Sequence, residues 1–265
     1  MQQPPPDEEL IYAVEQGVAL LTIHRPERMN AWTPALEECL KACIGRAGND
    51  PEVRCVVITG AGGAFCAGMD MQVLQASNRP PQAESLTDDD AGQRYGYLGA
   101  FSKPLIAAIN GAAAGVGLCL ALYCDVRFVV AGAKLTVPYA RRGLVAEHGT
   151  AWLLPRLVGP MHAADLLISG RTVTGDEAAH MGLAWALPAE GFLDAVLDRA
   201  REIALTTSPR SVRIIKRQLA EARYQTLGQA TQVADREIAA CRDTEDFREG
   251  VRHFLEKRPP QFTGN

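Results

Sequence analysis

Four short apolar runs constrain the fold of this chain more than any other feature. They cover Val18–His24, Val53–Thr59, Leu105–Asn110 and Val126–Ala131. These runs are strongly apolar, and Val18–His24 alternates poorly, so each run is predicted to form a buried strand. An apolar helix is predicted between the last two runs, at about 115–123. The sequence therefore predicts an α/β core.

Capping signals place helices around these strands. Thr33-Pro34 begins a helix that runs to about 45–48, with Thr33 as N-cap and Pro34 in the first turn. After Gly149 the chain is mostly helical, with helices predicted at 175–182, 190–206, 208–223 and 244–256. We expect a mobile tail over residues 1–9, a core over 10–200 and a helical C-terminal region over 201–265. The polar segment Ser77–Asp90 is predicted to be a flexible loop that leads into a helix.

Composition excludes several classes of protein. The seven cysteines include no C-x-x-C pair, which is typical of a reducing cytoplasm, and the five histidines have no metal-ligand spacing. The net charge of −4 gives no general attraction for nucleic acid. No apolar stretch approaches the roughly 18 residues that a membrane span needs. We therefore expect a cytoplasmic protein without a metal, a nucleic-acid partner or a membrane partner.

Two glycine-rich segments follow buried strands. The first is TGAGGAFCAGMD at Thr59–Asp70, and the second is NGAAAGVGLCLALYCD at Asn110–Asp125. Small residues at the end of a strand let the backbone approach a ligand and point N–H groups at it. Neither segment contains the G-x-G-x-x-G pattern of a dinucleotide site or the pattern of a P-loop. The pair indicates a site that binds a ligand through the backbone.

These segments carry a specific resemblance. ITGAGGAFCAGMD and PLIAAINGAAAGVGLCLALYCDVRF resemble the two oxyanion segments of the enoyl-CoA hydratase/isomerase (crotonase) superfamily. RPERMNAW, GLVAEHGTAWLLPRLVG, LISGRTVTGDEAAHMGLAW and EGVRHFLEKRPPQF resemble other motifs of that family, and they occur in its order. The resemblance implies a spiral of β-β-α turns with a helical C-terminal region that supports homotrimers or hexamers.

The resemblance also implies roles for particular residues. The backbone N–H groups of Ala67 and Val116 would form an oxyanion hole for a thioester oxygen. No resident cofactor is implied, and a coenzyme A thioester would be the substrate. Contacts with coenzyme A would fall on a further set of residues, which comprises Arg28, Met29, Ala31, Ala64, Asp70, Met71, Phe254 and Lys257.

The reaction depends on which carboxylates are present. Hydratases of the family use two glutamates, and the matching positions here hold Cys119 and Tyr139, neither of which replaces a carboxylate at neutral pH. Glu147 lies where isomerases of the family carry their catalytic acid, although it could instead cap the helix that begins near Gly149. An isomerase with Glu147 as sole acid and base is the first hypothesis. The alternatives are a hydratase that uses Glu147 alone and a degenerate acyl-CoA-binding protein. His148 is expected to be a satisfied neighbour without a catalytic role.

Overall fold

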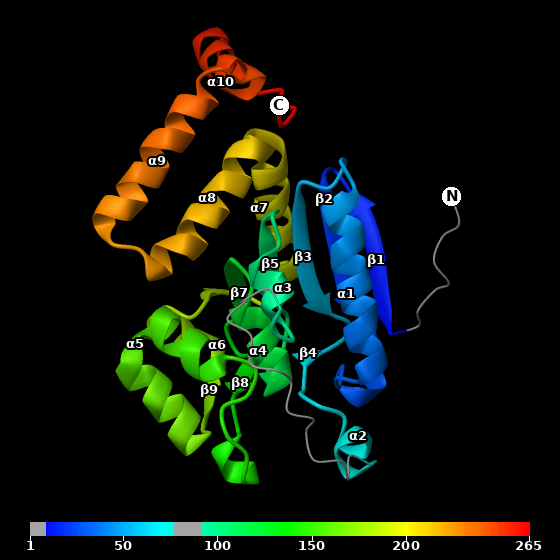
Figure 1. Cartoon of the computed structure of the whole chain (residues 1–265). Helices are drawn as coiled ribbons and strands as arrows, with labels where there is room; N and C mark the ends of the chain where they lie inside the picture. The colour runs from blue at the N-terminus through cyan, green and yellow to red at the C-terminus, as the bar shows by residue number, and fades with distance from the viewer. Residues whose placement is uncertain (1–8, 77–91) are drawn as a thin grey trace.

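Two sheets form the core of the part of the chain that the computed structural model describes, residues 9–76 and 92–265 (Figure 1). The six-stranded sheet has the order β1-β2-β3-β5-β7-β10, and the four-stranded sheet has the order β4-β6-β8-β9. The strands of the first sheet are β1 (Leu10–Glu15), β2 (Val18–Ile23), β3 (Cys55–Gly60), β5 (Leu105–Ile109), β7 (Val126–Val130) and β10 (Trp185–Leu187). Those of the second are β4 (Ala64–Cys66), β6 (Ala112–Ala114), β8 (Lys134–Thr136) and β9 (Thr172–Thr174).

The chain winds between the two sheets as a spiral. Each of the pairs β3/β4, β5/β6 and β7/β8 places its first strand in the large sheet and its second in the small sheet. Strands from successive turns pair in parallel, whereas β1–β2 and β8–β9 are antiparallel. The predicted spiral of β-β-α turns in an α/β fold is therefore confirmed.

Helices cover the sheets and form the C-terminal region (Figure 1). Those of the core are α1 (Pro34–Asn49), α2 (Met71–Ala76), α3 (Gly96–Gly99), α4 (Val116–Leu122), α5 (Thr150–Ser169) and α6 (Gly175–His180), with short 3-10 turns η1 (Pro26–Arg28) and η2 (Ala140–Arg142). The C-terminal helices are α7 (Phe192–Thr206), α8 (Pro209–Glu221), α9 (Leu227–Cys241) and α10 (Glu245–Glu256), with η3 (Ala222–Tyr224) between α8 and α9.

Apolar faces of the helices pack on both sides of the large sheet. On one side, α1 buries Leu36 and Leu40 in the main core cluster. On the other, α7 buries Phe192 and Val196 in a second cluster with residues of β2, β3 and β5. Burial of both faces explains why the strand sequences are almost continuously apolar. The proposed boundary at residue 200 falls inside α7, and Ala204 of that helix still packs in the second cluster.

The sequence predicted most of the long elements, but it missed β1, α9 and the short strands. The four apolar runs match β2, β3, β5 and β7, and the cap at Thr33 is present, because its side chain accepts a hydrogen bond from the Leu36 N–H at 3.1 Å. Strands β4, β6, β8, β9 and β10 have three residues each, too few for a periodic pattern. The tail over residues 1–8 and the loop at 77–91 lie outside the described residues.

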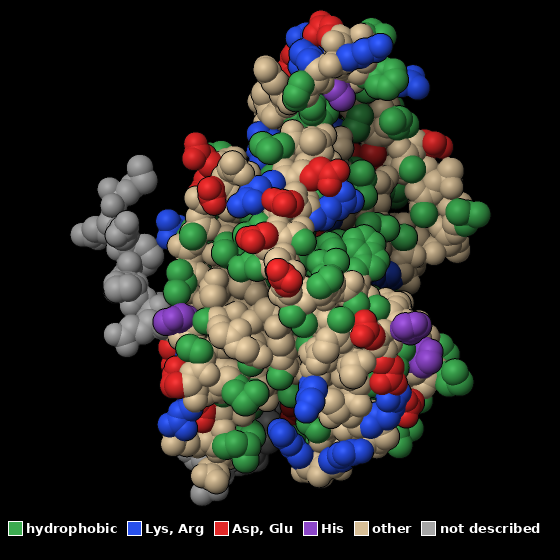
Figure 2. All heavy atoms as spheres, turned by 180° about the vertical axis from the view of Figure 1, so that it is seen from behind, with side chains coloured by type: hydrophobic (Ala, Val, Ile, Leu, Met, Phe, Trp, Pro, Cys, Tyr) green, Lys and Arg blue, Asp and Glu red, His purple; other side chains and the backbone are tan. Residues whose placement is uncertain are grey.

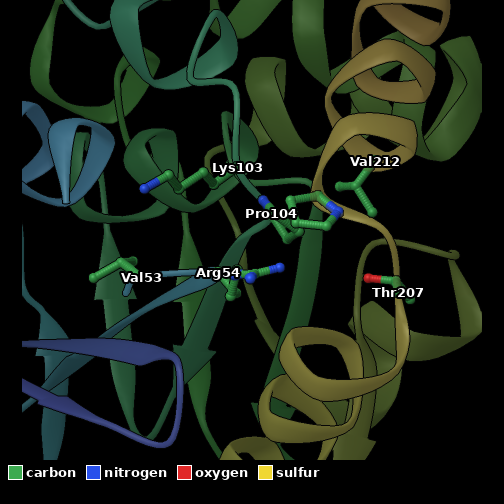
Figure 3. A pocket seen from close by; sticks show the side chains of 7 residues that line it. Val53, Arg54, Lys103, Pro104, Thr207 and Val212 are labelled. Carbon is green, nitrogen blue, oxygen red and sulfur yellow. The ribbon is translucent and has the colours of Figure 1, made fainter. Parts of the chain in front are cut away.

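A small pocket lies at the end of the large sheet where its central strands begin, opposite the site described below (Figure 3). It lies where β3 and β5 begin and where α7 passes into α8, and Arg54 and Lys103 line it. Both side chains serve the fold: Arg54 donates to the Phe262 carbonyl at 3.1 Å, and Lys103 donates to the carbonyls of Ala47 and Asp50 at 2.7 and 2.6 Å. Arg54 therefore holds the C-terminal segment against the core, and Lys103 holds the end of α1 against the start of β5.

Within the described residues, no helix combines the length and apolar character that crossing a bilayer would require.

The approach of α4 to β4 yields a stability prediction. A Cβ on Gly117 would overlap the carbonyl oxygen of Cys66. Both residues are buried, so the backbone cannot easily move apart. Gly117→Ala should therefore lower the free energy of unfolding by about 1–3 kcal/mol in urea denaturation, as overpacking does elsewhere. Gly228→Ala is the matched control, because Gly228 is also the second residue of a helix but has open space around it. Equal stability of the two variants would contradict this packing.

Candidate active site

The two glycine-rich segments meet at the carboxyl ends of β3 and β5. Asn110 joins them: its side-chain oxygen accepts from the Gly60 N–H at 3.1 Å, and its amide donates to the Gly62 carbonyl at 2.9 Å. Farther along, a Cβ on Gly68 would lie 3.1 Å from the Ala114 carbonyl oxygen, so the segments remain in close contact. In open α/β sheets the carboxyl ends of the strands are where ligands bind. We therefore place the candidate site here.

A polar network fixes the loop after β4 against η1. The buried Asn30 side chain donates to the carbonyls of Ala61 and Ala64 at 2.9 and 2.7 Å. Arg25 donates to the Asp70 carboxylate at 3.2 Å, and that carboxylate also accepts from the Gln72 N–H at 3.0 Å. The Gln72 hydrogen bond is the largest cause of a lowered pKa at Asp70; burial opposes it, and the hydrogen bond and charge of Arg25 lower the pKa further. Asp70 thus braces the loop after β4, and Asn30 braces the turn before β4 and the start of that strand. The role of Asn30 had no signal in the sequence beyond its place in RPERMNAW.

Backbone N–H groups differ in whether they have an acceptor. The Ala67 N–H donates to the Met29 carbonyl at 3.1 Å, so it is not available for a ligand in this structure. That bond argues against Ala67 as an oxyanion donor. Two residues further on, Met69 lies in a bridge with Trp32, and its own N–H has no acceptor among the described residues. The Val116 N–H is in the first turn of α4, where N–H groups have no partner within the helix.

Glu147 and His148 form a turn in front of α5. Their side chains face each other, with His148 Nε2 3.9 Å from Glu147 Oε2. The His148 side chain is 18% exposed and the Glu147 side chain is 40% exposed. Glu147 does not cap α5, because the N-cap is Gly149 and no side chain caps the helix. The capping alternative is therefore wrong. The sequence analysis expected His148 to have no catalytic role, and it did not predict this contact between the two side chains.

A second carboxylate nearby is held in an ion pair. Glu37 of α1 accepts two hydrogen bonds from Arg94, at 2.7 and 2.5 Å, and one from the Tyr95 hydroxyl at 3.1 Å. Burial alone would raise the pKa of Glu37, but the bonds from Arg94 and Tyr95 lower it below its usual value. The Tyr95 ring in turn packs edge-on against the His148 ring, with centroids 5.1 Å apart. Glu37 is therefore a fixed anion that orders this wall of the site.

Glu147 has the opposite electrostatic character. Burial raises the pKa of its carboxyl, and the charge of Arg94 offsets this only in part. Burial also lowers the pKa of His148 to about 4, with Arg94 acting in the same direction, so the imidazole is neutral at neutral pH. A carboxyl with a raised pKa next to a neutral imidazole suits proton transfer near neutral pH.

Cys119 and Tyr139 are both buried and supply no anion. Burial raises the pKa of the Cys119 thiol to about 12 and raises that of the Tyr139 phenol as well. Both groups are thus protonated hydrogen-bond donors at neutral pH. The described residues contain no group of three or more metal-ligating side chains.

The residues predicted to contact coenzyme A fall into two separate groups. Six of them lie at the end of η1, just after it, and on the segment from β4 to α2, which the contacts above hold together: Arg28, Met29, Ala31, Ala64, Asp70 and Met71. The other two, Phe254 and Lys257, are at the end of α10, and Figure 1 shows α10 and α2 at opposite ends of the molecule. Within one chain, Phe254 and Lys257 therefore do not lie beside the other six residues, because α8 and α9 carry α10 away from α2.

Comparison with known proteins agrees with this fold and site. A model of the family described as enoyl-CoA hydratase/isomerase matches residues 13–265. The 1,2-epoxyphenylacetyl-CoA isomerase of Escherichia coli K12 is 34% identical, over 97% of this chain and 99% of that protein. A probable enoyl-CoA hydratase of Rhodobacter capsulatus is 35% identical, over 96% and 97%. The crystal structure of a probable enoyl-CoA hydratase/isomerase from Mycobacterium abscessus superposes with a TM-score of 0.88 at 32% identity, covering 97% of this chain and 99% of that one.

The chain belongs to the enoyl-CoA hydratase/isomerase family. It is accordingly an enzyme of the hydratase/isomerase group that acts on coenzyme A thioesters, and its fold is that of the crotonase structures.

Burial of His148 makes stability depend on pH. Because its pKa is about 4 in the folded chain and 6.5 in a model compound, the unfolded chain binds more protons between these values. The contribution of His148 to the free energy of unfolding should therefore be fully present above pH 6.5 and be lost as the pH falls toward 4. This contribution is at most about 3 kcal/mol. Urea denaturation of the native protein and of His148→Gln across this range measures the effect. Parallel curves for the two proteins would contradict it.

Proposed function

We propose that this enzyme isomerises an enoyl-CoA thioester, with Glu147 as the single acid and base. The observation that carries the proposal is that Glu147 has a raised pKa while both positions of the hydratase glutamates hold uncharged, buried groups. As a carboxylate, Glu147 would take a proton from the acyl chain next to the carbonyl system and return it to another carbon. Such a transfer needs no water molecule and no second carboxylate. Glu37 is unsuited to this role, because Arg94 and Tyr95 hold it as an anion.

The thioester oxygen would be stabilised by two backbone N–H groups. Val116 at the start of α4 remains one of the proposed donors, and the free end of the helix dipole adds to it. We replace the other expected donor, Ala67, with Met69, because the Ala67 N–H is bound to Met29 and the Met69 N–H has no acceptor among the described residues. Coenzyme A would lie along η1 and the start of α2, near the six residues grouped there.

Hydration of an enoyl-CoA by Glu147 alone is the second candidate. Relatives named as hydratases favour it, including the 2,3-dehydroadipyl-CoA hydratase of Escherichia coli K12, which is 35% identical over 97% of this chain. In that reaction Glu147 would have to deprotonate water and also supply the proton to the adjacent carbon. A catalytically degenerate acyl-CoA-binding protein is the remaining alternative.

The reaction is decided by the mass of the product. With a 3-enoyl-CoA we expect a shift of the double bond without change of mass, and Glu147→Gln should lower kcat at least about 100-fold, the lower end for a lost general base. Chromatography with mass spectrometry measures both, and the exposed Glu190→Gln is the matched control. A product one water heavier from a 2-enoyl-CoA, lost in Glu147→Gln, would establish the hydratase. Binding of either thioester without turnover would favour the degenerate binder.

We propose that the C-terminal helices form the contact between copies in a homotrimer or hexamer. Helix α9 buries none of its fifteen residues within the chain. Large apolar side chains are exposed along α8, α9 and α10, where Figure 2 shows hydrophobic groups spread over the upper part of the molecule. An exposed apolar surface of this extent is typical of an interface. In such an assembly Phe254 and Lys257 of one copy would reach the coenzyme A of another.

Charge on this surface should dissociate the assembly. Leu227 of α9 and Phe254 of α10 are 85% and 77% exposed, so Leu227→Glu combined with Phe254→Glu leaves the core of the chain intact. Sedimentation velocity should show trimers or hexamers for the native protein and monomers for the variant, because buried carboxylates without partners oppose association. Ile11→Glu on the edge strand β1 is the control, with 47% exposure, and should assemble normally. A native monomer would contradict this proposal.

A cytoplasmic location is also proposed. All seven cysteines of the chain lie within the described residues, and none of them is in a disulfide, as expected in a reducing compartment.

A further inference from the structure

Four polar side chains around Glu147 and His148 are used by no step of the proposed reaction. Cys119, Tyr139 and Thr150 are 0%, 4% and 0% exposed, and Tyr123 at the end of α4 is half-buried. Buried polar groups cost free energy unless they are hydrogen-bonded. Their partners therefore indicate what these four side chains do.

Two of these side chains hold the carbonyl oxygen of His148. The Tyr123 hydroxyl donates to it at 2.9 Å, and the Cys119 thiol donates to it at 3.4 Å. Both donors come from α4, the helix whose first turn supplies the Val116 N–H. Burial keeps the Cys119 thiol protonated by raising its pKa to about 12, so it remains a donor at every physiological pH.

The other two hold the carbonyl oxygen of Glu147. The Thr150 hydroxyl donates to it at 2.6 Å, and the Thr150 N–H donates to it at 3.0 Å. Tyr139 lies 3.3 Å from the Thr150 hydroxyl oxygen. Because Thr150 has a single hydroxyl proton and gives it to Glu147, Tyr139 must donate to Thr150. The hydrogen bonds thus run from Tyr139 through Thr150 to the backbone of Glu147.

The backbone held by these bonds is unusual. His148 has φ +52°, a left-handed conformation that residues other than glycine seldom adopt, and Gly149 follows with φ +73°. A Cβ on Gly149 would lie 2.8 Å from the Tyr123 hydroxyl oxygen, so the turn fits closely over α4. Left-handed conformations of this kind cost free energy, and surrounding contacts must maintain them.

We propose that Cys119 and Tyr123, together with the pair Tyr139–Thr150, are positioning residues that hold the Glu147–His148 turn in its left-handed form. The turn places the Glu147 carboxylate 3.9 Å from the His148 imidazole, and its His148 carbonyl is bonded to Cys119 of α4. Cys119 and Tyr139 occupy the positions where hydratases of the family carry their glutamates, so in this chain those positions support the backbone of the remaining carboxylate. This inference rests on the proposed function of Glu147.

The turn determines where the carboxylate lies relative to the oxyanion donors. Val116 and Cys119 are three residues apart on α4, and the Cys119 thiol bonds to the residue after Glu147. The bonds from Cys119 and Tyr123 to the His148 carbonyl therefore tie the turn that carries the base to the helix that carries the proposed oxyanion donor. A displacement of about 1 Å between such groups can cost about 100-fold in rate.

The experiment compares variants that remove one donor at a time. Cys119→Ala and Tyr123→Phe should each lower kcat about 10-fold on the substrate that the native enzyme turns over, and the double variant about 100-fold. KM should stay unchanged, because coenzyme A binds on η1 and α2. Cys119→Ser keeps a donor and should retain most of the native kcat. The acid limb of the kcat profile should move to lower pH in the double variant, since a released Glu147 is more exposed and loses the burial that raises its pKa.

Two control variants separate positioning from a general loss of stability. Cys124→Ala removes another buried thiol, one that donates to the Leu120 carbonyl at 3.6 Å and lies away from the turn. Tyr12→Phe removes a buried hydroxyl of β1 that has no partner among the described residues. Both should keep native kcat and pH profile, whatever their effect on Tm.

The outcomes distinguish this inference from the proposed function. If Glu147→Gln is inactive while Cys119→Ala and Tyr123→Phe keep the native kcat and acid limb, the positioning role is overturned and Glu147 stands. If Cys119→Ser loses as much as Cys119→Ala, or Cys124→Ala loses as much kcat as either, the role of the hydrogen bond is overturned. If Glu147→Gln keeps full activity, the proposed function itself fails.

Discussion

The close approach of backbone to backbone between the two glycine-rich segments is the constraint on which the rest of the structure depends. A Cβ on Gly111 would overlap the Gly63 carbonyl, and one on Gly117 would overlap the Cys66 carbonyl. With only hydrogen at these positions, β6 can pair with β4, and α4 can begin against the loop after β4. That contact places the N–H groups of Met69 and Val116 on facing segments. The spiral and the candidate site therefore have the same steric origin.

Two carboxylates near this contact have been given different properties by their surroundings. Glu37 receives hydrogen bonds from Arg94 and Tyr95, which lower its pKa despite burial. Glu147 has no such donor among the residues that the structure describes, and burial raises its pKa. Arg94 acts on both, as a direct partner of Glu37 and as a more distant charge for Glu147. A fixed anion that orders the wall and a carboxyl whose raised pKa suits proton exchange thus lie on the same side of the candidate site.

Much of the fold could be predicted from the sequence because its long elements have strong local signals. The strands β2, β3, β5 and β7 are apolar throughout, and Thr33-Pro34 marks the start of α1. The three-residue strands of the small sheet have no such signal, since their pairing depends on segments far away in the chain. Helix α9 was missed for a related reason. None of its residues is buried within the chain, so its sequence does not carry the pattern of a helix that packs on the core.

The sequence by itself determined the α/β class, the two glycine-rich segments and Glu147 as the candidate carboxylate, because residue type and order carry these features. Only the tertiary structure decided which N–H groups are free, since the bond from Ala67 to Met29 joins segments that are distant in the chain. It also decided that α10 lies away from η1 and that Cys119 and Tyr139 support the turn of Glu147. These properties arise from contacts between distant segments, and a hydrogen bond between such segments leaves no mark in the local sequence.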